Sequence, residues 1–84
     1  MERASHNSLG TPPVIVERNL RGTVTGFDEP AGWGVITAES GEHIPFHCTA
    51  IADGSRDIAV GLAVRFDLGA GRMGRFEAAG VEPD

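Results

Sequence analysis

The only tryptophan of the chain, Trp33, has a glycine on each side, and this arrangement suits a residue that meets a flat ligand. Glycine neighbours carry no side chain that could shield the indole, so the ring either lies open for stacking or packs under a nearby loop. Further along the chain, His47 offers an imidazole that can stack, form a hydrogen bond with a ligand, or bond to the adjacent loop. These residue types predict contact with planar groups, with purely structural roles as the alternative.

Two other motifs suggest chemistry that their surroundings do not support. Residues 69–74 read GAGRMG and fit the dinucleotide pattern, but that site needs a following helix and an acidic residue about 20 positions later. His43, His47 and Cys48 suggest zinc, yet two histidines four residues apart on an extended strand lie about 13 Å apart, which is too far to share one ion. No set of carboxylates or hydroxyls marks an enzyme, so we expect no catalysis, no metal and no cofactor.

Alternating apolar residues predict that Trp33 and His47 lie on neighbouring strands. Residues 33–37 and 44–48 each alternate, and the short link at residues 39–42 predicts an antiparallel hairpin between them. This pairing places Val35 and Pro45 beside Trp33 and His47 on the outer face. The residues predicted to point into the interior are Ile36, Ile44, Phe46, Val64 and Phe66.

Three more segments, residues 20–27, 61–68 and 72–81, predict strands, with a turn at residues 69–71. Gly22 and Gly26 predict a bend or bulge in the first of them. Residues 49–57 predict one helical turn and then a loop, and residues 14–16 read as a lead-in segment, with an edge extension or partner-binding strand as the alternative. Five short strands with one long connection predict an all-β, five-stranded antiparallel Greek-key barrel, whose closure removes exposed edges.

Composition sets the broad class of the protein. Its 84 residues allow one domain, predicted at residues 14–82, with a flexible tail at 1–13 and an end at 83–84. Twelve acidic against seven basic residues give a net charge of −5, which argues against strong non-specific attraction to phosphates. A single cysteine, no apolar run of membrane length and no signal-like start predict a cytoplasmic protein. Every basic residue is arginine, which with the abundant glycine and alanine suggests a GC-rich bacterial genome.

Residues 21–81 resemble the cold-shock domain, a five-stranded barrel of OB type that binds single-stranded RNA and DNA. GWGVIT at residues 32–37 looks like the first ribonucleoprotein motif of that family, and IPFHCTAI at residues 44–51 looks like the second. The other similar segments are GTVTGFD at residues 22–28, VGLAVRF at residues 60–66, Gly74, and AAGV at residues 78–81.

The resemblance also implies a binding face, which the family builds from about eight aromatic or histidine side chains. Phe27, Trp33 and His47 keep that character, and Phe27 is expected to be half core because it ends a strand. The family's aromatic positions are otherwise occupied by Gly26, Val35, Pro45, Cys48 and Ser55, and Ala31 replaces a basic residue. Arg56 matches a basic loop position that could meet a phosphate, although a local ion pair with Asp53 or Asp57 competes.

We therefore expect a non-enzymatic, monomeric module that binds single-stranded nucleic acid weakly and with little base specificity, away from membranes. The residues expected to contact the strand are Phe27, Trp33, Val35, Pro45, His47 and Arg56. The alternative is a barrel of the same type that has been repurposed for protein contact, because valine, proline and cysteine leave a smaller and more apolar face.

Overall fold

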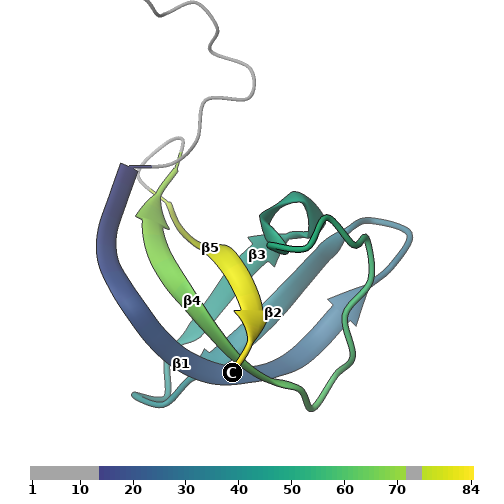
Figure 1. Cartoon of the computed structure of the whole chain (residues 1–84), viewed down its shortest axis with the longest axis horizontal. Coiled ribbons are helices and arrows are strands. Elements are labelled where there is room, and N and C mark those ends of the chain that lie inside the picture. The colour runs from purple at the N-terminus through teal and green to yellow at the C-terminus, as the bar shows by residue number, and fades with distance from the viewer. Residues whose placement is uncertain (1–13, 72–74) are drawn as a thin grey trace, which may run out of the picture.

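The computed structural model describes residues 14–71 and 75–84, and in them five strands form one antiparallel sheet in the order β3-β2-β1-β4-β5 (Figure 1). The elements are β1 (Val14–Asp28), β2 (Trp33–Ala38), β3 (His43–His47), the short 3-10 helix η1 (Cys48–Ala50), β4 (Ala63–Ala70) and β5 (Phe76–Pro83). The sheet curls strongly, which confirms the predicted all-β, barrel-like fold. No helix in the described residues is long and apolar enough to cross a membrane.

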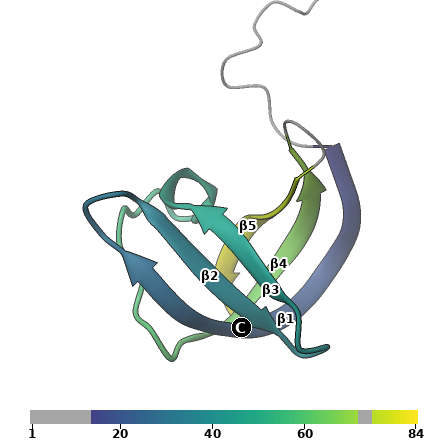
Figure 2. The same ribbon diagram turned by 180° about the vertical axis from the view of Figure 1, so that it is seen from behind.

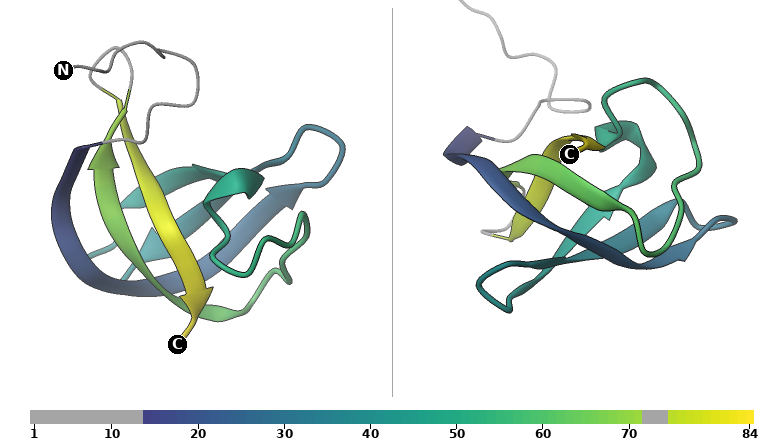
Figure 3. Two further views of the ribbon diagram at one scale, coloured as in Figure 1. Left: turned by 45° about the horizontal axis from the view of Figure 1, so that its top comes forward. Right: turned by 60° about the horizontal axis from the view of Figure 1, so that its bottom comes forward.

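The two edge strands close the barrel by packing rather than by a ladder of hydrogen bonds. β3 and β5 lie against each other, and within the described residues only the isolated bridge between Ile51 and Val81 joins this side of the structure. η1 follows β3 directly and lies beside β5 (Figure 3). The expectation that closure would remove every edge is therefore only partly met.

β1 is the strand that bends the sheet, because its first half pairs with β4 and its second half with β2. The register shifts between Val24 and Gly26, which confirms the bulge predicted from the glycines. A second irregularity lies before Leu20, where Asn19 has a φ of 60° and its backbone N–H donates to Asp67 Oδ1 at 3.1 Å. Such bulges increase the local twist and let one strand serve two halves of a barrel.

Several predicted boundaries are wrong. β1 begins at Val14, so residues 14–16 are not a lead-in: Val14 pairs with Ala70, and β4 accordingly continues through the predicted turn at Gly69 and Ala70. Three β-branched residues favour extension once a partner strand is available. β5 starts at Phe76, and residues 72–74 of the predicted last strand lie outside the described residues. The predicted helical turn is confirmed as the shorter η1.

The interior contains every residue predicted to point inward. Ile36, Phe46, Val64 and Phe66 are almost completely buried, and Ile44 is buried as well. Val24, Ile51, Ala78 and Val81 join the same cluster from β1, the segment after η1, and β5, and Ala38 and Cys48 also belong to it. The apolar faces of both halves of the curled sheet therefore meet in one core, and the opposite face of β2 and β3 is left to solvent.

Candidate nucleic-acid interface

The outer face of the β2–β3 hairpin brings the predicted stacking residues together. Trp33 pairs with His47 across the strands, and Val35 pairs with Pro45 in the next outward position. The hairpin lies in the foreground of Figure 2. The indole of Trp33 is 44% exposed, and its ring centroid lies 5.0 Å from that of His47 with the planes at 71°. The outward direction predicted for these four residues is thus confirmed, and the exposed indole lies beside the half-buried imidazole.

Gly34 explains how Trp33 can sit above such a well-packed core. A Cβ built on Gly34 would lie 2.5 Å from Cζ and 2.6 Å from Cε1 of Phe46. The ring of Phe46 therefore fills the space that a side chain at Gly34 would need. This close approach anchors the strand to the core directly beneath Trp33, so the indole itself is not required for packing there.

His47 has a structural role in addition to its place beside Trp33. Its Nδ1 accepts the backbone N–H of Thr49 at 3.3 Å and lies 2.9 Å from Thr49 Oγ1, so the imidazole caps η1. Because a backbone N–H can only donate, Nδ1 carries no proton and the neutral ring has its proton on Nε2. The cap fixes the ring orientation and leaves the Nε2–H as a donor.

Phe27 lies on a different side of the sheet from Trp33. It pairs with Gly34 across β1 and β2, and its half-buried ring stacks on Phe46 with a centroid distance of 6.0 Å and an angle of 13°. The expectation that it is half core is confirmed. One face of its ring is covered by Phe46, and the expected edge contact with a ligand stays a prediction.

Arg56 borders a hollow at the end of the hairpin. The hollow has a volume of about 340 Å³, and its lining is Glu29, Pro30, Ala31, Gly32, His47, Cys48 and Arg56. Arg56 is exposed, and no carboxylate in the described part of the chain is in ion-pair range of it. Asp53, one of its expected partners, instead takes hydrogen bonds from the Ser55 side chain and from the Ser55 N–H at 2.8 Å, which lower the pKa of Asp53.

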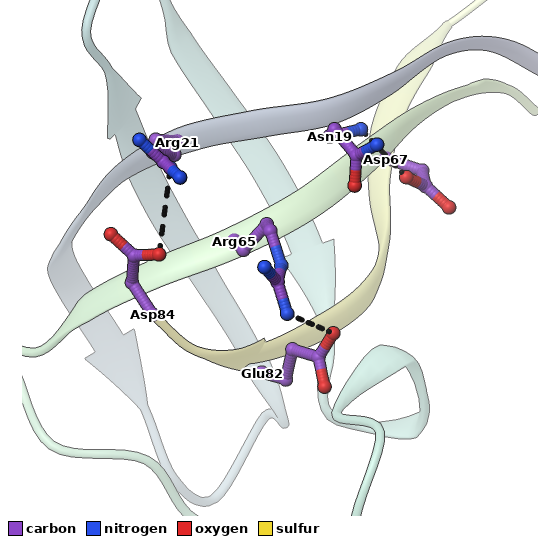
Figure 4. Close-up of polar contacts among 6 residues, drawn as sticks. All are labelled: Asn19, Arg21, Arg65, Asp67, Glu82 and Asp84. Carbon is purple, nitrogen blue, oxygen red and sulfur yellow. Dashed lines mark hydrogen bonds and ion pairs between the residues drawn. The ribbon is translucent and has the colours of Figure 1, made fainter.

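Three other arginines, on β1 and β4, are paired with carboxylates, and Figure 4 draws two of these pairs, those of Arg21 and Arg65. Arg21 lies 3.5 Å from Asp84, and Arg65 lies 3.4 Å from Glu82. Arg18 lies 3.8 Å from Asp67, which also accepts the N–H of Asn19. These exposed pairs contribute little to stability, but they neutralise the arginines of β1 and β4. Among the described residues, Arg56 is the arginine that lines a hollow together with His47, which places it to meet a phosphate near Trp33 and His47.

Sequence reasoning missed a polar row on the same outer face. Thr25 Oγ1 lies 3.0 Å from Thr37 Oγ1, and Thr37 Oγ1 lies 3.1 Å from His43 Nδ1. Thr37 and His43 are a cross-strand pair, two positions beyond Val35 and Pro45. From the sequence, we considered His43 only as a metal ligand. Its spacing of four residues from His47 on one strand already places both side chains on the same face.

A family model described as the 'Cold-shock' DNA-binding domain matches residues 20–83, which is more than half of the chain. The chain belongs to the cold-shock domain family. Cold-shock domains form a family that binds single-stranded nucleic acid rather than a family of enzymes. A search of curated protein sequences finds no match.

The positions at which this cold-shock domain departs from the family's aromatic pattern are distributed unevenly over the surface. Val35 and Pro45 are exposed on the outer face, and a Cβ on Gly26 would meet no atom within 4 Å. Cys48 is buried, because it turns inward at the start of η1. Three of the five missing rings, those at Gly26, Val35 and Pro45, would therefore have stood beside Trp33 and His47 on the exposed face.

Proposed function

We propose that this cold-shock domain binds single-stranded RNA or DNA weakly, and with little base specificity, across the outer face of β2 and β3. The observation that carries the proposal is the exposed indole of Trp33 beside the oriented imidazole of His47. Each base that stacks on an aromatic side chain contributes about 1–3 kcal/mol and requires no particular sequence. Because this face offers two stacking rings where the family has a larger set, we expect it to bind nucleic acid more weakly.

Electrostatic attraction adds little to this binding. The net charge of −5 repels a polyanion at long range, and three arginines are occupied by carboxylates. Arg56 lies next to the hollow that His47 also lines, so it can meet one phosphate of a strand stacked on the two rings. Affinity in this proposal therefore comes mainly from stacking, with a shallow dependence on salt.

The second candidate is a protein-binding surface at the same place. Exposed Val35 and Pro45 form an apolar pair between Trp33–His47 and the threonine row, and apolar side chains surrounded by polar ones are typical of protein contacts. The replacement of stacking rings by small apolar residues favours this alternative. It predicts an intact fold that has no measurable affinity for nucleic acid.

Tryptophan fluorescence separates the two functions because Trp33 is the only tryptophan in the chain. Oligothymidine or oligouridine titrated at low salt is expected to quench the Trp33 emission in a saturable manner. Circular dichroism of the same sample checks that the fold is intact. A folded protein whose emission does not change at high micromolar strand concentration would refute nucleic-acid binding at this face and support protein contact.

A further inference from the structure

The polar row beside the proposed stacking surface has a definite direction of hydrogen bonding. Thr25 Oγ1 donates to the backbone carbonyl of Val35 at 3.4 Å, in addition to its contact with Thr37 Oγ1. A carbonyl oxygen can only accept, and a hydroxyl has one proton to donate. If Thr25 donates to Val35, then Thr37 must donate to Thr25, and His43 Nδ1 must donate to Thr37.

This is the single assignment in which all three contacts are hydrogen bonds at the same time. It fixes the neutral imidazole of His43 with its proton on Nδ1, so that Nε2 is an acceptor. His43 is exposed, and thus Nε2 is accessible to a ligand. His47 has the opposite tautomer, because its Nδ1 accepts the N–H of Thr49 and its Nε2 carries the proton. The outer face of β3 therefore presents one acceptor and one donor.

We propose that His43 is a second binding position for the strand, at which Nε2 accepts a hydrogen bond from an N–H on the edge of a base. Thr37 and Thr25 are positioning residues that hold this tautomer. The inference rests on the proposed nucleic-acid function and extends it to a residue outside the stacking pair. His43 and His47 are separated by about 13 Å along the strand, so the two imidazoles serve different nucleotides.

The chemistry favours a base over the phosphate backbone. A phosphate oxygen is an acceptor and finds no donor at a neutral Nε2 that has no proton. Adenine, cytosine and guanine carry exocyclic amino donors, and thymine and uracil carry a ring N–H at N3. Every base can thus donate to His43, which agrees with the low base specificity proposed for the whole face.

The tautomers can be measured without any ligand. Long-range proton–nitrogen NMR spectra of the ¹⁵N-labelled protein at about pH 8, where imidazole is normally neutral, distinguish a proton on Nδ1 from one on Nε2. The proposal expects the Nδ1–H form for His43 and the Nε2–H form for His47. Thr37→Val removes the hydroxyl that accepts the proton of His43, so this variant should shift His43 toward the ordinary mixture. An Nε2–H tautomer for His43 in the unchanged protein would overturn the proposal.

Binding then tests the contact itself. His43→Ala is expected to weaken binding of oligothymidine about 3- to 10-fold, the range for one lost hydrogen bond. The same variant should bind an oligomer of N3-methylthymidine as well as the unchanged protein does, since that base has lost its N–H donor. An equal effect of His43→Ala on both probes would assign the contact to the backbone and refute base recognition.

A double-mutant cycle isolates the role of Thr37. Thr37→Val should weaken oligothymidine binding, yet the double variant with His43→Ala should be no weaker than His43→Ala alone. Thr23→Val is the matched control, because Thr23 is exposed and pairs with Thr37 across β1 and β2. It should leave affinity unchanged. If His43→Ala has no effect while the unchanged protein still binds, only this inference fails; if the unchanged protein does not bind, both proposals fail.

Discussion

Restoring one aromatic ring at Val35 should strengthen binding without disturbing the fold. Val35 is 36% exposed and lies opposite Gly26, where a Cβ would have no atom within 4 Å. The ring of Val35→Phe can therefore lie over Gly26 next to Trp33. One stacked base contributes about 1–3 kcal/mol, which corresponds to an affinity gain of about 5- to 150-fold. Titration with oligothymidine, followed by quenching of Trp33, measures the gain.

The same substitution elsewhere provides the control for this experiment. Val16 is 51% exposed on the part of β1 that pairs with β4, far along the strand from β2. Val16→Phe adds the same apolar area and should leave affinity unchanged, and both variants should melt within a few degrees of the unchanged protein. Equal gains from the two variants would indicate non-specific apolar attraction. No gain from a folded Val35→Phe would show that the outer face of β2 does not stack bases.

Three further predictions concern the core, His47 and Arg56. Phe66→Ala should lower the free energy of unfolding by about 3–5 kcal/mol, measured by denaturant titration, because Phe66 is 1% exposed; a melting curve like that of the unchanged protein would contradict its place in the core. His47→Ala should lose about 1–3 kcal/mol of binding and about 0.5–2 kcal/mol of stability, whereas His47→Asn keeps an acceptor for the Thr49 N–H and should recover stability but not affinity. Equal melting of the two variants would refute the cap. With one phosphate contact, the slope of log affinity against log salt should be about −0.7, and Arg56→Ala should bring it near zero; an unchanged slope would assign the phosphate contact to another residue.

Much of the fold could be predicted because its signals are local. The alternation of apolar residues in β2 and β3 predicts both the hairpin and the residues that point into the core. The glycines of β1 predict its bulge. The extent of β1 could not be predicted, because Val14 is held by Ala70, a partner distant in sequence. Pairing of that kind depends on tertiary contacts rather than on local propensity.

The candidate site was predictable in part for a similar reason. Strand parity placed Trp33 and His47 side by side, and the structure agrees. Parity did not show that His47 caps η1, nor that Thr25 reaches Thr37 across the bulge, because both depend on side-chain hydrogen bonds. The binding roles of all these residues remain predictions.

An NMR titration shows directly whether single-stranded nucleic acid stacks on the outer face of β2 and β3. Proton–nitrogen spectra recorded as oligothymidine is added report every backbone N–H and the indole N–H of Trp33. We expect progressive shifts of the signals of Trp33, Val35 and His47, while the signals of Arg65 and Glu82 on the distant strands β4 and β5 stay unchanged. Shifts confined to β4 and β5, or no shifts at strand concentrations that saturate the fluorescence signal, would contradict stacking on this face.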